Sequence, residues 1–116
     1  MRLLELAAKL AAGGSQDRHY RFAALIKRHD GAIVVSHNSL TKIPEPLAHA
    51  EARVLRKADI GSTLYVARIL RDNSWALAKP CPRCQAMIRA KGVIRVYYTI
   101  GPDEWGTWDV GRHKEP

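Results

Sequence analysis

The chain has 116 residues, of which 47% are hydrophobic, and its formal net charge is +8. This length allows a single domain over residues 1–116 with one core, and it excludes a separate recognition domain. The apolar residues form no run long enough to cross a bilayer, and the N-terminus lacks a signal-type apolar region, so we expect a cytoplasmic protein with no membrane partner. The positive charge favours an anionic partner such as a nucleotide or single-stranded nucleic acid, although a basic surface can also serve solubility alone.

The first predicted elements are a helix and a hairpin. Residues 1–12 place leucines and alanines at helical spacing, and a glycine pair ends the pattern, which predicts an amphipathic helix. Residues 20–28 and 32–37 are apolar runs rich in strand formers. Because residues 29–31, His-Asp-Gly, supply a tight turn between them, the pattern predicts a β-hairpin.

A loop and a second helix follow the hairpin. Residues 39–47 contain two prolines and predict an irregular loop that leads into a helix over residues 48–58. Asn38 begins this loop and Lys42 lies within it. An asparagine at such a place can close a turn with its own side chain, and a loop lysine can be merely solvated. Their positions before the helix also make both residues candidates for substrate contacts, with Lys42 meeting a phosphate.

The next stretch predicts a strand, a helix and a strand in close succession. Residues 63–70 are apolar at most positions, which is typical of a strand buried on both faces. Residues 71–79 form a loop, residues 82–91 a helix that ends at Gly92, and residues 93–100 a further strand. Such tight connections favour a βαβ unit with parallel strands.

Three tryptophans lie in the second loop and in the tail. Trp75 is the conspicuous residue of the loop, where an indole can stack on a base or cover the core. The residues after Ile100 are too few for a crossover helix plus a strand, so we expect residues 105–110 to fold back as a short antiparallel strand at most. Trp105 and Trp108 in this stretch can pack in the core or at a subunit interface.

Two short motifs carry most of the chemical information in the chain. They are His-Ala-Glu at residues 49–51 and Pro-Cys-Pro-Arg-Cys at residues 80–84. His49, Cys81 and Cys84 offer one imidazole and two thiolates to a zinc ion, and a catalytic zinc site keeps its fourth position for water. The two cysteines share one side of the first turn of a helix that starts there, and the dipole and N–H groups of that turn favour thiolate.

Glu51 lies next to this ligand set without being needed as a ligand. Zinc lowers the pKa of its bound water to about 7, and a nearby carboxylate can take that proton and pass it to a leaving amine. Two cysteines at this spacing also occur as redox pairs, but a redox pair needs no upstream His-x-Glu sequence. A structural zinc site has four protein ligands, so a binding module in which Glu51 is the fourth ligand is a further alternative.

The two motifs, in this order, resemble the signature of the zinc-dependent cytidine and deoxycytidylate deaminase superfamily. Residues 80–99 resemble the zinc helix and next strand of that family. Residues 36–52 resemble the strand end, the substrate-contacting asparagine and the zinc helix of its deoxycytidylate and tRNA-adenosine branches. Small phage-type deoxycytidylate-deaminase-like proteins look similar as well. The likeness covers about residues 21–100.

This resemblance implies a three-layer α/β/α fold of the cytidine-deaminase type. The sheet would be mixed, with four to five strands, the two zinc-binding helices on one face and the N-terminal helix on the other. The resemblance also implies one Zn²⁺ per chain, held by His49, Cys81 and Cys84, with Glu51 as the catalytic proton carrier and Asn38 in contact with the sugar or base. It further makes Trp105 and Trp108 candidates for base contacts, because they lie where this family often reads its substrate. Because such small layers leave apolar helix surface to cover, we expect a homo-oligomer.

Three hypotheses on function follow from these features. The first is hydrolytic deamination of cytosine to uracil in a deoxycytidylate-type nucleotide or a nucleoside. The second moves this chemistry to single-stranded DNA or RNA, with Trp75 or Trp105 stacking on bases, and adenine is an alternative base. The third is a zinc-stabilised nucleic-acid-binding module without catalysis. The short tail is more like free-nucleoside cytidine deaminases and some compact deaminase toxins than like the deoxycytidylate, tRNA-adenosine and polynucleotide branches.

Overall fold

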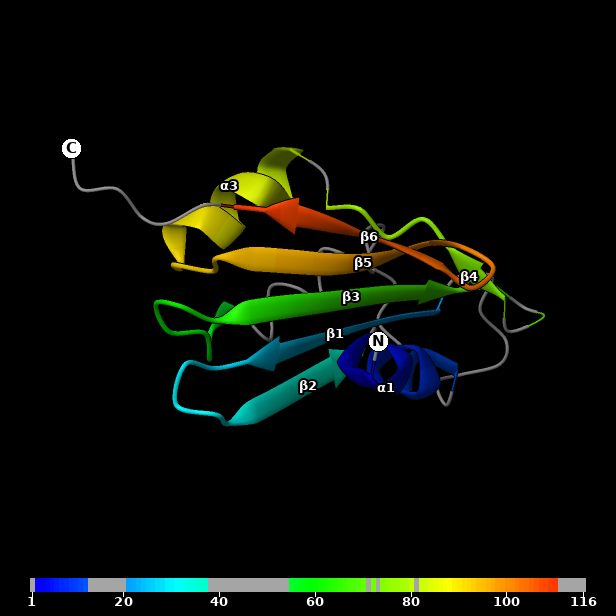
Figure 1. Ribbon diagram of the computed structural model, residues 1–116, viewed down its shortest axis with the longest axis horizontal. Helices are drawn as coiled ribbons and strands as arrows, with labels where there is room; N and C mark the ends of the chain where they lie inside the picture. The colour runs from blue at the N-terminus through cyan, green and yellow to red at the C-terminus, as the bar shows by residue number, and fades with distance from the viewer. Residues whose placement is uncertain are drawn as a thin grey trace, which may run out of the picture.

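The computed structural model describes residues 2–12, 21–37, 55–70, 72, 74–80 and 82–110, which include two helices and six strands. The helices are α1 (Arg2–Ala12) and α3 (Pro82–Ala90). The strands are β1 (Arg21–Lys27), β2 (Ile33–His37), β3 (Thr63–Ile69), β4 (Trp75–Ala76), β5 (Arg95–Gly101) and β6 (Glu104–Asp109) (Figure 1). None of the described helices has the length and apolar character needed to cross a membrane.

The strands form one mixed sheet with β3 near its centre. The order across the sheet is β2-β1-β3-β5-β6, and β4 pairs with β3 beside this path. Strands β3 and β5 are parallel, which confirms the predicted βαβ unit, and the other pairs are antiparallel. Strand β6 folds back on β5, as the short tail predicted.

In the described part of the chain the sheet has six strands, whereas the sequence predicted four to five. The additional strand is β4, which lies inside the stretch predicted to be a loop. Its pairing with β3 follows from a tight turn, in which the N–H of Leu70 donates to the carbonyl of Ser74 at 2.9 Å. The carboxylate of Asp72 accepts from the backbone N–H of Ser74 at 2.9 Å and stabilises that turn.

The β1–β2 hairpin forms as predicted and has a three-residue loop. The N–H of Gly31 donates to the carbonyl of Arg28 at 2.9 Å, and the N–H of Arg28 donates to the carbonyl of Ala32 at 2.8 Å. Gly31 has φ +93°, a conformation that glycine adopts without strain. This combination of a turn and a glycine of positive φ is the usual three-residue hairpin loop, and it fixes which backbone groups of β2 face β1.

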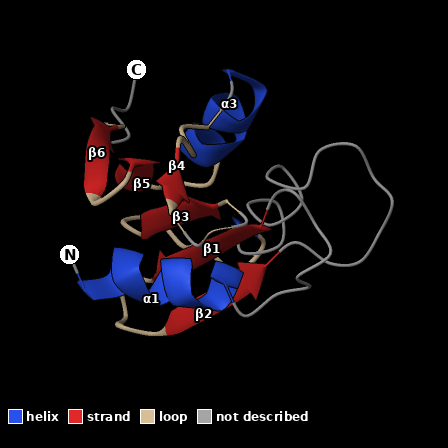
Figure 2. Cartoon of the chain, turned by 90° about the vertical axis from the view of Figure 1, so that its right-hand side faces the viewer, coloured by secondary structure: helices blue, strands red, loops and turns tan. Residues whose placement is uncertain are grey.

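Two apolar clusters cover the two faces of the sheet and make the fold three-layered. On one face, α1 packs Leu4, Ala7, Ala8 and Ala11 against residues of β1 and β3 that include Leu25 and Tyr65. On the other face, Ile88 of α3 packs with Leu64, Val66 and Val96. Figure 2 shows α1 and α3 on opposite sides of the sheet. The alternation of β3 between the two clusters explains why nearly all of its residues are buried, as predicted.

The predicted second zinc helix lies largely outside the described residues. Leu55 is its described end, in helical conformation, and residues 56 and 57 form a turn, so the helix ends about three residues earlier than predicted. Leu55 is 1% exposed and belongs to the same cluster as Ile88. This end of the second helix therefore packs on the face that α3 covers.

Candidate active site

Among the predicted zinc ligands and the predicted proton carrier, Cys84 is the residue that the structure describes. The other residues predicted for the site in the two motifs, and the two loop candidates for substrate contacts, lie outside the described residues; these are His49, Glu51, Cys81, Asn38 and Lys42. In the described part of the chain, no group of three His, Cys, Asp or Glu side chains could hold a metal ion. The described part of the site consists of the elements that carry and support Cys84.

Cys84 is the third residue of α3 and lies in its first turn. The helix begins at Pro82, and proline is favoured at a first helical position because it has no N–H to leave unpaired. The side chain of Cys84 is 5% exposed, and Ile88, one turn further along α3, is fully buried. The two residues share the helix face that is turned to the sheet. A thiol held there has little access to water, and it is close to the positive end of the helix dipole.

The chain that leads into α3 is held in place by Thr99 of β5. The hydroxyl of Thr99 donates to the carbonyl of Ala76 at 2.6 Å and accepts from the backbone N–H of Arg68 at 3.1 Å. The backbone N–H of Ala78 donates to the carbonyl of Thr99 at 2.9 Å. Thr99 is 0% exposed, so these bonds are shielded from water. One side chain thus joins β3, β4 and β5 just before residues 80–84.

A further bond joins α3 to the residue before its motif. The side-chain amide of Gln85 donates to the carbonyl of Pro80 at 2.8 Å. Because Pro80 and Gln85 enclose residues 81–84, this bond restrains the first turn of α3 from both ends. The sequence did not indicate the roles of Thr99 and Gln85, since neither residue belongs to a local pattern that predicts such contacts.

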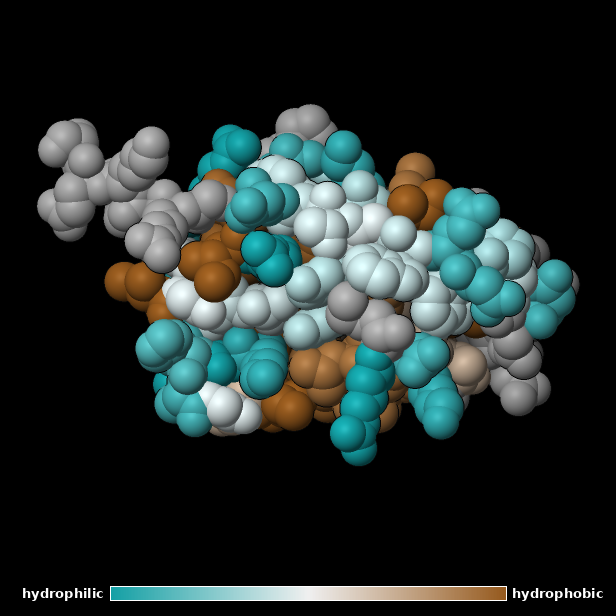
Figure 3. Space-filling model, viewed as in Figure 1, coloured by the Kyte–Doolittle hydropathy of each residue, from teal (hydrophilic) through white to brown (hydrophobic). Residues whose placement is uncertain are grey.

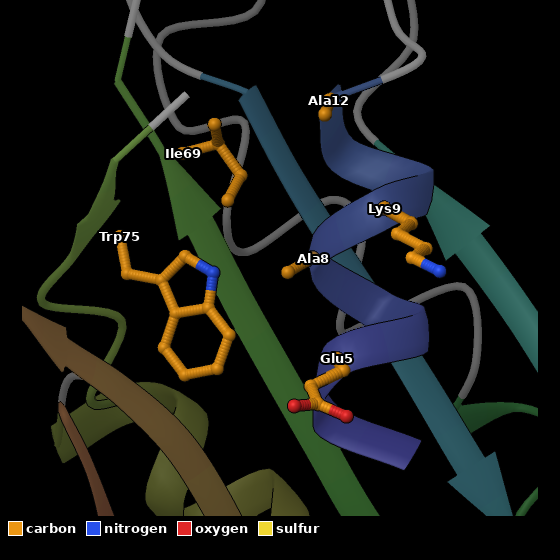
Figure 4. A pocket seen from close by; sticks show the side chains of 6 residues that line it. All are labelled: Glu5, Ala8, Lys9, Ala12, Ile69 and Trp75. Atoms are coloured by element: carbon orange, nitrogen blue, oxygen red, sulfur yellow. The ribbon is translucent and has the colours of Figure 1, made fainter. Parts of the chain in front are cut away.

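Trp75 lies on the face of the sheet that α1 covers. Its indole packs against the cluster that contains Leu4 and Tyr65, whereas Cys84 belongs to a helix on the opposite face. The indole also lines a groove of about 390 Å³ between β3 and α1, together with Ile69 and the α1 residues Glu5, Ala8, Lys9 and Ala12 (Figure 4). Trp75 therefore covers part of the core, and a contact with substrate remains a prediction.

Trp105 is the outer ring of an aromatic row on the same face. The rings of Tyr65 and Tyr97 are stacked with centroids 5.2 Å apart, and Trp105 meets Tyr97 edge-on at 5.7 Å. Burial raises the pKa of Tyr65, so its phenol stays neutral. Trp105 is 44% exposed, which leaves its indole accessible to a ligand. Its predicted contact with substrate also remains a prediction.

Trp108 lies on the other side of β6 and packs against the α3-face cluster. The guanidinium of Arg89 lies 5.3 Å from the centre of its ring. This arrangement supports packing rather than base stacking as the role of Trp108. Packing was one of the two roles that the sequence allowed. The two tail tryptophans thus serve different faces of the sheet.

The fold and the motif together define a class of protein. It is a three-layer α/β protein in which a Pro-Cys-Pro-Arg-Cys sequence opens the helix between two parallel strands. The sequence model of the cytidine and deoxycytidylate deaminase zinc-binding region matches residues 1–100, from α1 into β5. The chain therefore belongs to the cytidine and deoxycytidylate deaminase zinc-binding family, which confirms the resemblance of its motifs. No solved structure matches the chain.

The residues of the chain fit the zinc ion that this family binds. One imidazole and two thiols are ligands that zinc prefers, and three protein ligands leave a position for water. Cys84 is buried in the first turn of a helix, where the local N–H groups favour its thiolate. The predicted ligand set of His49, Cys81 and Cys84 is therefore chemically consistent with the one described position, and its geometry stays a prediction.

Proposed function

We propose that this chain is a zinc-dependent hydrolase that converts cytosine to uracil in a deoxycytidylate-type nucleotide or a nucleoside. Membership of the family supports deaminase chemistry in general. The observation that carries the proposal is the pair of motifs at residues 49–51 and 80–84, in the order of the family, with Cys84 buried in the first turn of α3.

His49, Cys81 and Cys84 would hold one zinc ion. When bound, zinc supplies a water whose pKa falls to about 7. The net reaction adds water at C4 of cytosine, breaks the bond between C4 and the exocyclic nitrogen, and releases ammonia. Glu51 carries one proton of the water to N3, where uracil retains it, and the other proton to the leaving amine. The electron pair of the broken bond leaves with the ammonia.

The described scaffold supports this chemistry by restraining the helix that carries Cys84. The bonds from Thr99 hold the preceding segment against β5, and the bond from Gln85 to Pro80 restrains the first turn. A preorganised site of this kind loses less free energy on ordering its ligands. We infer that Asn38 positions the sugar or base and that Lys42 meets a phosphate, in line with the net charge of +8.

Two substitutions separate the roles of proton carrier and ligand. Glu51→Ala should retain one zinc per chain and lose about 10²–10⁴-fold in activity, because general acid–base catalysis contributes about that factor. Cys84→Ser should lose zinc and stability together, since the binding energy of a metal ion is also folding energy. Metal content by mass spectrometry and product formation check both. Zinc lost from Glu51→Ala, or kept in Cys84→Ser, would contradict these roles.

A second candidate keeps the chemistry and changes the substrate to single-stranded nucleic acid. The exposed indole of Trp105, at the end of an aromatic row, favours it, because bases stack on such rings. Binding of a cytosine-containing oligonucleotide with a steep salt dependence would support this candidate, since phosphate contacts release counterions. A salt-insensitive interaction, or none, would favour the free nucleotide.

A further inference from the structure

Strand β2 is an outer strand of the described sheet, and Ile33 and Val35 are the exposed side chains that the structure places on it. It consists of Ile-Val-Val-Ser-His and contains no Lys, Arg, Asp, Glu or Pro. Ile33 is 49% exposed and Val35 is 45% exposed. Its register against β1 is regular over its whole length, without a bulge. Figure 3 shows hydrophobic side chains at the lower edge of the face on which α1 and β2 lie. Outer strands usually carry charges, prolines or bulges that prevent pairing, and β2 carries none of these.

The hairpin loop determines which backbone groups of β2 face outward. Arg28 and Ala32 are joined by a backbone hydrogen bond, so they form a hydrogen-bonded pair of the ladder. Such pairs alternate along antiparallel strands, and Val34, which is paired with Ile26, is therefore the next one. The N–H and C=O groups of Ile33 and Val35 consequently point away from β1. Among the described residues, none forms a backbone bond with them.

We propose that β2 is the interface strand of a homodimer. Two copies pair their β2 strands antiparallel about a twofold axis at Val35, so that the two sheets become one. Val35 then exchanges both backbone bonds with Val35 of the second copy, and Ile33 lies opposite position 37. The exposed side chains of Ile33 and Val35 project to the side of the sheet on which α1 lies and cover those of the second copy.

A second copy fits this strand for two reasons. The outward groups are arranged symmetrically about Val35, so the strand is complementary to itself, as a twofold interface requires. The chain as a whole has a net charge of +8, and its copies repel each other wherever charged surfaces meet. Because β2 carries no Lys or Arg, pairing there places no such like charges directly opposite each other.

The mass of the protein in solution tests this proposal. Sedimentation velocity at about 10–100 µM should give twice the chain mass of 13.0 kDa for the wild type. Val35→Pro removes the outward N–H and leaves the bonds to β1 in place, so it should give a folded monomer. Val35→Lys, which places a charge at the twofold axis, should do the same. Far-UV circular dichroism establishes that each variant is folded.

Ile60→Lys is the matched control. Ile60 is 74% exposed in the turn before β3, so this variant also replaces an exposed apolar side chain with a charge and should remain dimeric. A monomeric wild type would overturn the proposal, as would a dimer that persists in whichever Val35 variant folds. A wild-type assembly larger than a dimer would agree with the proposal only if the substitution at Val35 halved the mass of that assembly.

Oxidative cross-linking tests the register independently. In a hydrogen-bonded antiparallel pair the Cα atoms are about 5.5 Å apart, which lies within the range of about 4.4–6.8 Å that a disulfide spans. Val35→Cys should therefore form a covalent dimer. Ile60→Cys should give no more cross-linking than the wild type, whose own cysteines set the background. A dimeric Val35→Cys protein without additional cross-linking would refute the twofold register.

Discussion

The hydroxyl of Thr99 lies 2.6 Å from the carbonyl oxygen of Ala76, 23 residues earlier in the chain. This bond, with the one from Arg68 to the same hydroxyl, ties β4 to the two parallel strands that flank the candidate site. Both backbone groups would be left without this partner if the hydroxyl were removed. The fold therefore uses one buried side chain to position the segment that leads to the cysteine motif.

Thr99→Val should lower the free energy of unfolding by about 1–3 kcal/mol, because it leaves buried polar groups unsatisfied while keeping the shape of the side chain. Denaturant unfolding measures the change. Thr99→Ser is the control, since it keeps the hydroxyl and removes one methyl group. If Thr99→Ser lost as much stability as Thr99→Val, packing rather than the hydroxyl would be responsible.

Gly92 and Gly31 both have positive φ, but only Gly92 is crowded. A Cβ at Gly92 would lie 2.9 Å from the Cα of Ile60, whereas nothing lies within 4 Å of a Cβ at Gly31. Gly31→Ala should therefore lower the free energy of unfolding by only about 1–2 kcal/mol, which is the cost of a Cβ on a backbone of positive φ. Gly92→Ala should lower the free energy of unfolding by clearly more, because the backbone at Ile60 must also move to make room for the Cβ. Thermal or chemical unfolding compares them, and equal losses would show that the contact at Gly92 relaxes freely.

Asp59 makes stability depend on acid pH. The backbone N–H of His29 and the hydroxyl of Ser62 donate to its carboxylate, at 3.0 and 2.7 Å, and together with the Arg28 guanidinium they lower the pKa of Asp59. The folded pKa is thus below the unfolded one. The contribution to stability is complete above the unfolded pKa and is lost as the pH falls through the folded pKa.

Asp59→Asn should reduce stability at neutral pH and flatten the loss of stability on acidification. Denaturant unfolding between about pH 6 and about pH 2 measures both effects. Ser62→Ala, which removes one of the donors to Asp59, should reproduce part of the change. If Asp59→Asn lost as much stability on acidification as the wild type, other carboxyl groups would be responsible for that loss.

The contact between Arg89 and Trp108 should stabilise the junction of α3 and β6. A guanidinium 5.3 Å from an indole centre contributes about 0.5–1 kcal/mol at an exposed site. A double-mutant cycle with Arg89→Ala and Trp108→Leu isolates this coupling from the packing of each residue. If the effects of the two substitutions were additive, the two side chains would have no stabilising interaction with each other.

The elements that sequence reasoning predicted correctly are those with local signals. The helical spacing of residues 2–12 and the turn at Gly31 each determine the local structure within a few residues. Strand β4 was missed because its pairing depends on the turn at residues 70–74 and on Thr99, which is distant in the sequence. Two strand residues give no period from which to predict them.

One part of the candidate site, the position of Cys84, could be predicted from the local sequence. Pro82 and the cysteine spacing predicted that Cys84 lies in the first turn of a helix, and it does. The side of the sheet on which Trp75 lies was not predictable, because a loop residue has no alternation to read. Asn38, Lys42, His49, Glu51 and Cys81 lie outside the described residues, so their roles, like the cytosolic location, remain predictions.

The most direct test of the account is mass spectrometry of the products formed by zinc-loaded protein. The substrates are deoxycytidine, deoxycytidylate and a cytosine-containing single-stranded oligonucleotide in one mixture. The wild type should form uracil from deoxycytidylate or deoxycytidine, and Glu51→Ala should lose most of that product. Uracil in the oligonucleotide alone would favour the second candidate. Zinc-loaded, folded protein that converts none of the three would contradict the proposed function.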